Sequence, residues 1–256
     1  MINLLVFLVA TLYGSVGHGG ASGYLAVLAL LGYAPAMMST SALLLNLVVA
    51  GTAWLTFWRA GYGSWRLIWP FLATSVPCAL LGGWLDVSAQ IYHRLLAVAL
   101  LFAAGRLCLS AFQMAQAEPK RSVAPPARRD TSSAARMVPP RSVALPVGAG
   151  IGLISGIVGV GGGIFLSPLM VLCRWASAKQ TAAASACFIV VNSAAGLAGR
   201  VAAGHVAVDG LAPLIGAAFA GGWLGSRLGA GYFSNPVLCR ILAGVLMVAA
   251  VKGLLR

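Results

Sequence analysis

Two glycine clusters stand at matching places in the two halves of the chain, and they are the segments best suited to chemistry. The first runs from Gly14 to Gly20 and the second from Gly156 to Gly163. Glycine permits a break in a helix, and a helix that begins after the break presents free N–H groups to an anion. Close packing of helices through small residues is the alternative for a single cluster. Because the cluster recurs, we predict discontinuous helices at a substrate site.

His18 is the ionisable side chain inside the first cluster. Imidazole gains or loses a proton near neutral pH, so His18 is a candidate for contact with a substrate or a proton. Its counterpart in the second half is Val160, which weighs against a role common to both halves. His205 follows Gly204 in an expected loop, and we predict that it is a surface residue.

Asn46 and Asn192 occupy the middle of apolar segments, each after a stretch rich in hydroxyl side chains. Two interpretations stay open: the amides join helices by hydrogen bonds, or they line a translocation path and donate to an anion. Ser22 and Ser167 lie just beyond the glycine clusters. The predicted substrate-binding residues are Gly17, His18, Gly19, Gly20, Ser22, Asn46, Gly159, Gly161, Gly162, Gly163, Ser167 and Asn192.

Four arginines mark the ends of apolar segments. Arg59 and Arg200 end the second segment of each half, and Arg94 and Arg240 begin the fourth. We predict that they extend to the membrane interface, as long cationic side chains do. An arginine that instead entered the path would offer a fixed positive charge to an anion.

Carboxylates are scarce and lie outside the apolar segments or at their edges; they are Asp86, Glu118, Asp130 and Asp209. Few carboxylates are therefore available to form a proton relay or a metal site, so we predict no metal and no cofactor. The five cysteines have no CxxC spacing, and we expect them to be packing residues. These features favour an anionic or neutral substrate over a cation.

The composition is that of a membrane protein. Of 256 residues, 60% are hydrophobic and 8% charged, and the first charged side chain is Arg59. This excludes a soluble enzyme, which would carry roughly 25% charged residues. The 17 Lys and Arg lie between apolar runs and in one linker. We therefore predict that the protein lies in a lipid bilayer and binds no nucleic acid. Trp and Tyr gather at segment ends, as in an interfacial belt.

Charges, prolines and glycines divide the apolar sequence into segments near residues 2–31, 36–58, 67–85, 92–113, 143–172, 181–200, 207–226 and 237–254. Motifs recur in order in the two halves, including Gly82-Gly83-Trp84-Leu85 and Gly221-Gly222-Trp223-Leu224. We predict an all-α polytopic membrane protein with about eight transmembrane segments in two homologous four-segment repeats. The first segment of each repeat is broken at its glycine cluster. The parts are a repeat over 1–115, a basic cytoplasmic linker over 116–142 and a repeat over 143–256.

The path of residues 2–31 and 143–172 has two solutions. If each segment crosses the bilayer once, the repeats are parallel; if each is a re-entrant hairpin, the repeats are inverted. The distribution of Lys and Arg allows both. We favour eight crossings, and we interpret residues 2–31 as a first membrane segment and not a removable signal.

A family resemblance rests on these motifs: Gly152 to Gly163, Pro168-Leu169, Asn192-Ser193 and Gly221-Gly222-Trp223-Leu224-Gly225. They resemble the TauE/SafE family of sulfite exporters, also called the 4-toluene sulfonate uptake permease family. The resemblance covers nearly the whole chain except the linker. It implies an inner-membrane permease for small sulfur-containing or related organic anions, coupled to a proton or sodium gradient, with the glycine clusters, serines and asparagines as its site.

Two other classes of function are weighed against a transporter. A membrane-embedded enzyme would need a nucleophile, a base or a metal cluster, and the sequence has no HExxH motif, no paired acids and no Ser/Lys pair in register. We therefore predict that the protein is not an enzyme. A scaffold or accessory subunit without transport activity remains the alternative.

Overall fold

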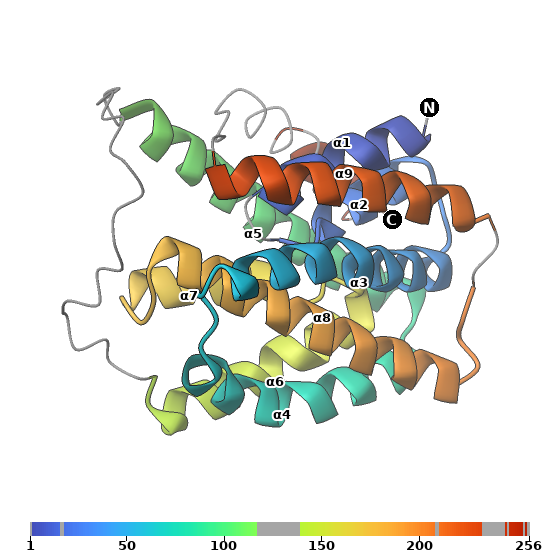
Figure 1. Cartoon of the computed structure of the whole chain (residues 1–256). Helices are drawn as coiled ribbons and strands as arrows, with labels where there is room; N and C mark the ends of the chain where they lie inside the picture. The colour runs from blue at the N-terminus through green and yellow to red at the C-terminus, as the bar shows by residue number, and fades with distance from the viewer. Residues whose placement is uncertain are drawn as a thin grey trace.

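The computed structural model describes residues 2–15, 18–116, 139–207, 210–231, 244, 246–252 and 254. Throughout these ranges the regular structure is helical (Figure 1). The helices are α1 (Ile2–Ser15), α2 (Ala21–Leu30), α3 (Pro35–Arg59), α4 (Trp65–Trp84), α5 (Ala89–Gln116), α6 (Arg141–Val158), α7 (Gly163–Leu172), α8 (Ala178–Ala202) and α9 (Ala212–Gly231).

The predicted breaks are present in both long first segments. Residues 16–20 separate α1 from α2, and Gly159 to Gly162 separate α6 from α7. The segments predicted to be unbroken correspond to α3, α4, α5, α8 and α9, with ends that differ by a few residues. The predicted linker falls mostly on residues 117–138, which lie outside the described residues. In the last predicted segment, 237–254, residues 244, 246–252 and 254 are described and helical, as predicted, and the other residues lie outside the described part.

The long helices α3 and α8 form the centre of the molecule and run antiparallel. Asn46 of α3 donates a hydrogen bond to Ser193 of α8. Toward the end of α3, Phe57 packs against Ala182 and Ala183, near the beginning of α8. The two helices therefore begin at opposite ends of the molecule, and their midpoints meet at Asn46.

Two helix pairs flank this centre, with α1 beside α9 on one side and α4 beside α6 on the other (Figure 1). Both pairs run parallel. In α6 and α4 the backbone of Gly148 lies against Phe71 and that of Gly156 against Ala79, and in α9 and α1 Gly221 lies against Phe7 and Gly225 against Thr11. Small residues allow such close contact between membrane helices. In both pairs, the helix that precedes a break packs against a helix from the other half of the chain.

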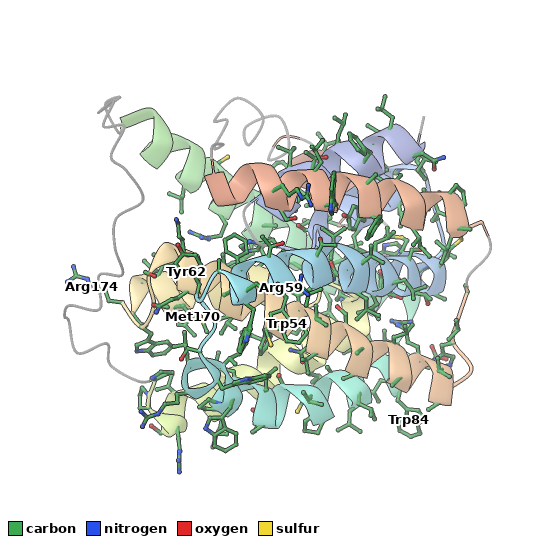
Figure 2. All side chains as sticks on the ribbon, in the orientation of Figure 1. Trp54, Arg59, Tyr62, Trp84, Met170 and Arg174 are labelled. Atoms are coloured by element: carbon green, nitrogen blue, oxygen red, sulfur yellow. The ribbon has the colours of Figure 1, made fainter. Side chains whose placement is uncertain are left out.

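Both broken segments fold back toward the end of the molecule at which they start. Met170 and Trp175, at and beyond the end of α7, share one apolar cluster with Ala144 near the start of α6. At the opposite end, Ile2 packs against the cluster that holds Leu28 of α2. Figure 2 shows Met170 and Arg174 near the left-hand end, where α6 also begins.

The fold-back differs from the eight straight crossings that we favoured. The ten residues of α7 span about 15 Å, which is half of a bilayer core of about 30 Å. Because the chain reverses at the break, the helices on its two sides do not add up to one continuous crossing. The prediction from sequence spacing counted both sides as a single span.

Four helices of the described part are long and apolar enough to cross a membrane: α3, α4, α6 and residues 179–202 of α8. Aromatic side chains lie near their ends, as predicted for an interfacial belt. Trp65, Trp69 and Trp84 are each about half exposed. In Figure 2, Tyr62 and Trp84 lie toward opposite ends of the molecule.

Candidate functional site

The two breaks meet at the centre, between the midpoints of α3 and α8. A Cβ atom on Gly161 would lie 2.5 Å from Asn46 Nδ2 and 2.9 Å from the Ile189 side chain. A Cβ atom on Gly19 would collide with Asn46 Oδ1 and lie 3.0 Å from Ile189. The structure therefore brings Gly19, Gly161 and Asn46 together, although they come from three separate segments.

The helices after the breaks begin at this centre without a side-chain cap. Gly20 precedes α2 with φ 85°, and Gly162 precedes α7 with φ 79°. An ordinary L-residue rarely adopts this left-handed conformation, which explains glycine at both positions. The first N–H groups of a helix have no partner within it and carry partial positive charge. Two such helix ends therefore offer N–H donors at the breaks.

A chain of polar side chains connects the first break to α7. His18 Nε2 lies 2.8 Å from Ser167 Oγ, which is also 2.9 Å from Ser185 Oγ. The Ser167 hydroxyl donates to the Gly163 carbonyl at 2.6 Å. Because this hydroxyl has one hydrogen, it accepts from His18 Nε2–H and from Ser185. The bond from His18 therefore crosses between the halves of the chain.

A small cavity lies between the breaks and is too small for a molecule larger than water. Its volume of about 10 Å³ is roughly what one water molecule requires. Ser22 lies at its edge and shares a 2.7 Å hydrogen bond with the Tyr13 hydroxyl. A substrate anion needs the surrounding side chains to move apart. The cavity is lined by Tyr13, His18, Gly19, Gly20, Ala21, Ser22, Val160, Ile164 and Ile189.

The two asparagines differ in their contacts. Asn46 Nδ2 donates to Ser193 Oγ at 3.4 Å, so this amide joins α3 to α8. Asn192 Nδ2 donates to the Phe188 carbonyl of its own helix at 2.9 Å. Both side chains are fully buried, and the Oδ1 atom of each has no hydrogen-bond partner. Of the remaining predicted residues, Gly17 lies outside the described part of the chain.

The prediction that Arg200 extends to the membrane interface is wrong. Arg200 is 6% exposed and does not extend to the surface; it donates to the Ile157 carbonyl at 2.7 Å. The reason is the end of α6, where backbone carbonyls without helical partners attract a cation. Arg59 and Arg94 are exposed, which is compatible with a position at the membrane interface, and Arg240 lies outside the described residues.

Sequence reasoning also missed several partners at the centre. Ser185 was visible only as a member of a hydroxyl-rich stretch, Ser193 only as part of the Asn192-Ser193 motif, and Tyr13 precedes the first cluster. Ile189 lines the cavity, and nothing in the sequence marks this apolar residue as part of a site. Within the described ranges, no three His, Cys, Asp or Glu side chains gather as a metal site would require. The groups that converge are N–H, hydroxyl, amide and imidazole, all of which can donate to an oxyanion.

Comparisons with known proteins identify the family of the chain. The family model described as Sulfite exporter TauE/SafE matches residues 2–253. A relative from Sinorhizobium fredii (strain NBRC 101917 / NGR234), named "Probable membrane transporter protein y4hK", is 36% identical over 251 residues, which cover 98% of this chain and 96% of the relative. No solved structure matches the chain. With its apolar helices and glycine breaks, the chain belongs to the TauE/SafE family of membrane transporters.

Proposed function

We propose that this membrane transporter is a secondary transporter of a small anion, such as sulfite, a sulfonate or a related organic anion, in the cell inner membrane. One observation carries the proposal: two uncapped helix starts converge on a buried centre of neutral hydrogen-bond donors. Helix starts of this kind bind anions. The described carboxylate, Asp86, is exposed at the end of α4 and does not compete for that place.

In this proposal the anion binds between the breaks. The backbone N–H groups at the starts of α2 and α7 donate to its oxygens, together with the second N–H of the Asn46 amide. Ser167 joins them by turning its one hydrogen from the Gly163 carbonyl to the anion. His18 lies beside Ser167 and adds positive charge when it is protonated. Asn192 contributes through the structure of α8, because its amide donates to the Phe188 carbonyl of the same helix.

We further propose that the halves, residues 1–115 and 143–256, are inverted repeats joined by a cytoplasmic linker. The antiparallel course of α3 and α8 supports this arrangement, since these helices follow the breaks in the two halves. The equivalent pairing of α1 with α9 and of α6 with α4 supports it as well. Inverted repeats with broken helices are a common basis of alternating access, with the substrate near the midplane.

The test is transport by the purified full chain in proteoliposomes. Labelled sulfite, an alkyl sulfonate and a carboxylate are each offered under an inward proton gradient, an inward sodium gradient and no gradient. We expect accumulation of at least one sulfur oxyanion, dependent on one gradient. The absence of movement for every anion would reject the proposal and favour a scaffold or accessory subunit, which would co-purify with one partner and show no ligand-dependent melting shift.

A further inference from the structure

The carboxyl end of α6 is capped completely, and mostly by other helices. A helix leaves its last four carbonyls without helical partners. Here Ser155 O accepts from the Gly159 N–H at 2.8 Å, the one local bond. Arg200 of α8 donates to Ile157 O at 2.7 Å and, more weakly, to Gly156 O at 3.5 Å. The hydroxyl of Tyr92, from α5, donates to Val158 O at 3.3 Å.

Arg200 is an unusual residue in this place because its charge is buried. The guanidinium stays protonated under all ordinary conditions, and a charge inside a membrane protein is costly unless it has partners. Its partners are backbone carbonyls at the negative end of the α6 dipole. A buried charge used in this way holds one particular helix end in one particular place.

The held helix end leads directly into the second break. Gly159 follows Val158, and the break continues to Gly162, where α7 begins. Val160, in the middle of the break, is 4% exposed and lines the central cavity. The position of the α7 N–H groups therefore depends on where α6 ends.

We propose that Arg200 and Tyr92 are positioning residues for substrate binding: they fix the end of α6 to α8 and α5 and so hold the second break in its binding geometry. This inference rests on the proposed transport function for its kinetic test. Neither side chain needs to touch the anion. A site whose donors are fixed before binding binds more tightly than one that must be ordered during binding.

The kinetic test compares Arg200→Gln, Arg200→Lys and Tyr92→Phe in proteoliposomes. Arg59→Gln is the matched control, because Arg59 ends the other long central helix and is exposed. We expect KM to rise about tenfold in Arg200→Gln and about threefold in Tyr92→Phe, as bonds to a charged and a neutral donor are lost, with partial recovery in Arg200→Lys. A purely structural role would reduce the amount of folded protein and leave KM of that protein unchanged, which would overturn the inference.

A second test does not depend on transport. Val160→Cys is introduced into a chain whose five native cysteines are replaced by alanine, and its reaction with a maleimide is followed. Adding Arg200→Gln should raise the labelling rate about fivefold as the break loosens, and Tyr92→Phe about twofold, whereas Arg59→Gln should leave it unchanged. Unchanged labelling in folded Arg200→Gln would overturn the positioning role; if that variant does not fold, unchanged labelling in Tyr92→Phe does so.

The two proposals fail separately. If the wild-type protein moves no anion but Arg200→Gln accelerates the labelling, the proposed function is wrong and the positioning role stands. If transport is present and neither KM nor labelling responds to Arg200→Gln, the positioning role is wrong and the proposed function stands.

Discussion

The two glycine breaks share a backbone design and differ in how they are held. Each ends in a left-handed glycine, Gly20 or Gly162, that starts a helix at the centre. In the first break, His18 bonds across to Ser167 in the other half of the chain. In the second, the corresponding Val160 is apolar, and the break is tied through the end of α6 to Arg200.

What the two breaks share is therefore their backbone conformation, and what differs is their side-chain contacts. The helix starts need glycine in both halves because the conformation requires it. In the proposed function, a proton-sensitive group and an anchor for the breaks each need to be supplied once, since both breaks face the same centre. Variants that affect one break and leave the other intact can measure this division.

The largest expected effect is that of Gly161→Ala. Its backbone is left-handed, with φ 76°, and the new methyl group would lie 2.5 Å from Asn46 Nδ2. Strain and collision together should lower transport by about thirtyfold or more. Gly19→Ala meets the Asn46 side chain without a positive φ and should lose less, about tenfold. Initial uptake rates measure both.

The control for these variants is Gly51→Ala in α3, where a Cβ atom meets nothing within 4 Å. It should transport normally and melt at an equal or higher temperature, because alanine favours a helix over glycine. Equal losses in Gly161→Ala and Gly51→Ala would contradict the placement of the second break at the site.

The next effect distinguishes the two asparagines. Asn46→Ala removes the hydrogen bond between α3 and α8 and leaves Ser193 without this donor, so KM should rise about tenfold. Asn192→Ala removes a bond within α8, and KM should change by about threefold or less. Anion KM values and the melting temperatures of both variants decide the question; a larger effect on KM in Asn192→Ala would refute the assignment of Asn46 to the centre.

His18→Gln separates the breaks by their response to pH. A protonated imidazole beside Ser167 adds positive charge near the start of α7, so wild-type transport should fall as pH rises through the range in which imidazole loses its proton. Glutamine can still donate but does not titrate. The variant should therefore be nearly independent of pH between about 5.5 and 8 and about fivefold slower at the acidic end.

An alkyl sulfonate is the substrate for this experiment, because its own charge is constant over the range. Val160→Ala, at the corresponding position of the second break, is the control and should keep the wild-type pH profile. A variant His18→Gln with an unchanged profile would remove His18 from the transport cycle and favour sodium coupling.

The sequence predicted the breaks because local chemistry determines them: left-handed positions such as Gly20 and Gly162 require glycine. It left the fold-back open as one of two solutions and favoured the straight crossing, since the direction after a break depends on what α7 packs against. Trp175 meets Phe71, with ring centroids 6.0 Å apart, only after α4 is in place. Long-range contacts of this kind cannot be predicted from the spacing of residues in the sequence.

The candidate site shows the same limit. The prediction of Ser167 and Asn46 as site residues rests on their position near a cluster or inside an apolar run, which is local information. Arg200 was placed at the surface because an arginine at the end of an apolar segment usually extends to the interface. Its true surroundings are the carbonyls of α6, more than forty positions earlier in the chain.

The smallest predicted effect concerns how the central helices begin, and it tests stability alone. Ser177 caps α8: its Oγ accepts from the Gln180 N–H at 3.4 Å, and Gln180 Oε1 accepts from the Ser177 N–H at 3.2 Å. Ala34, before Pro35 of α3, has an extended backbone and no side-chain cap. Ser177→Ala should lower the free energy of unfolding by about 1 kcal/mol, and Ala34→Ser should raise it by about 0.5 kcal/mol, both visible as opposite shifts in Tm in detergent.

Because both positions are exposed and far along the chain from the breaks, KM should stay unchanged in each variant. A change in KM without a change in Tm would mean that the ends of α3 and α8 move during transport, and that the asymmetry between the halves extends from the breaks to the starts of the central helices.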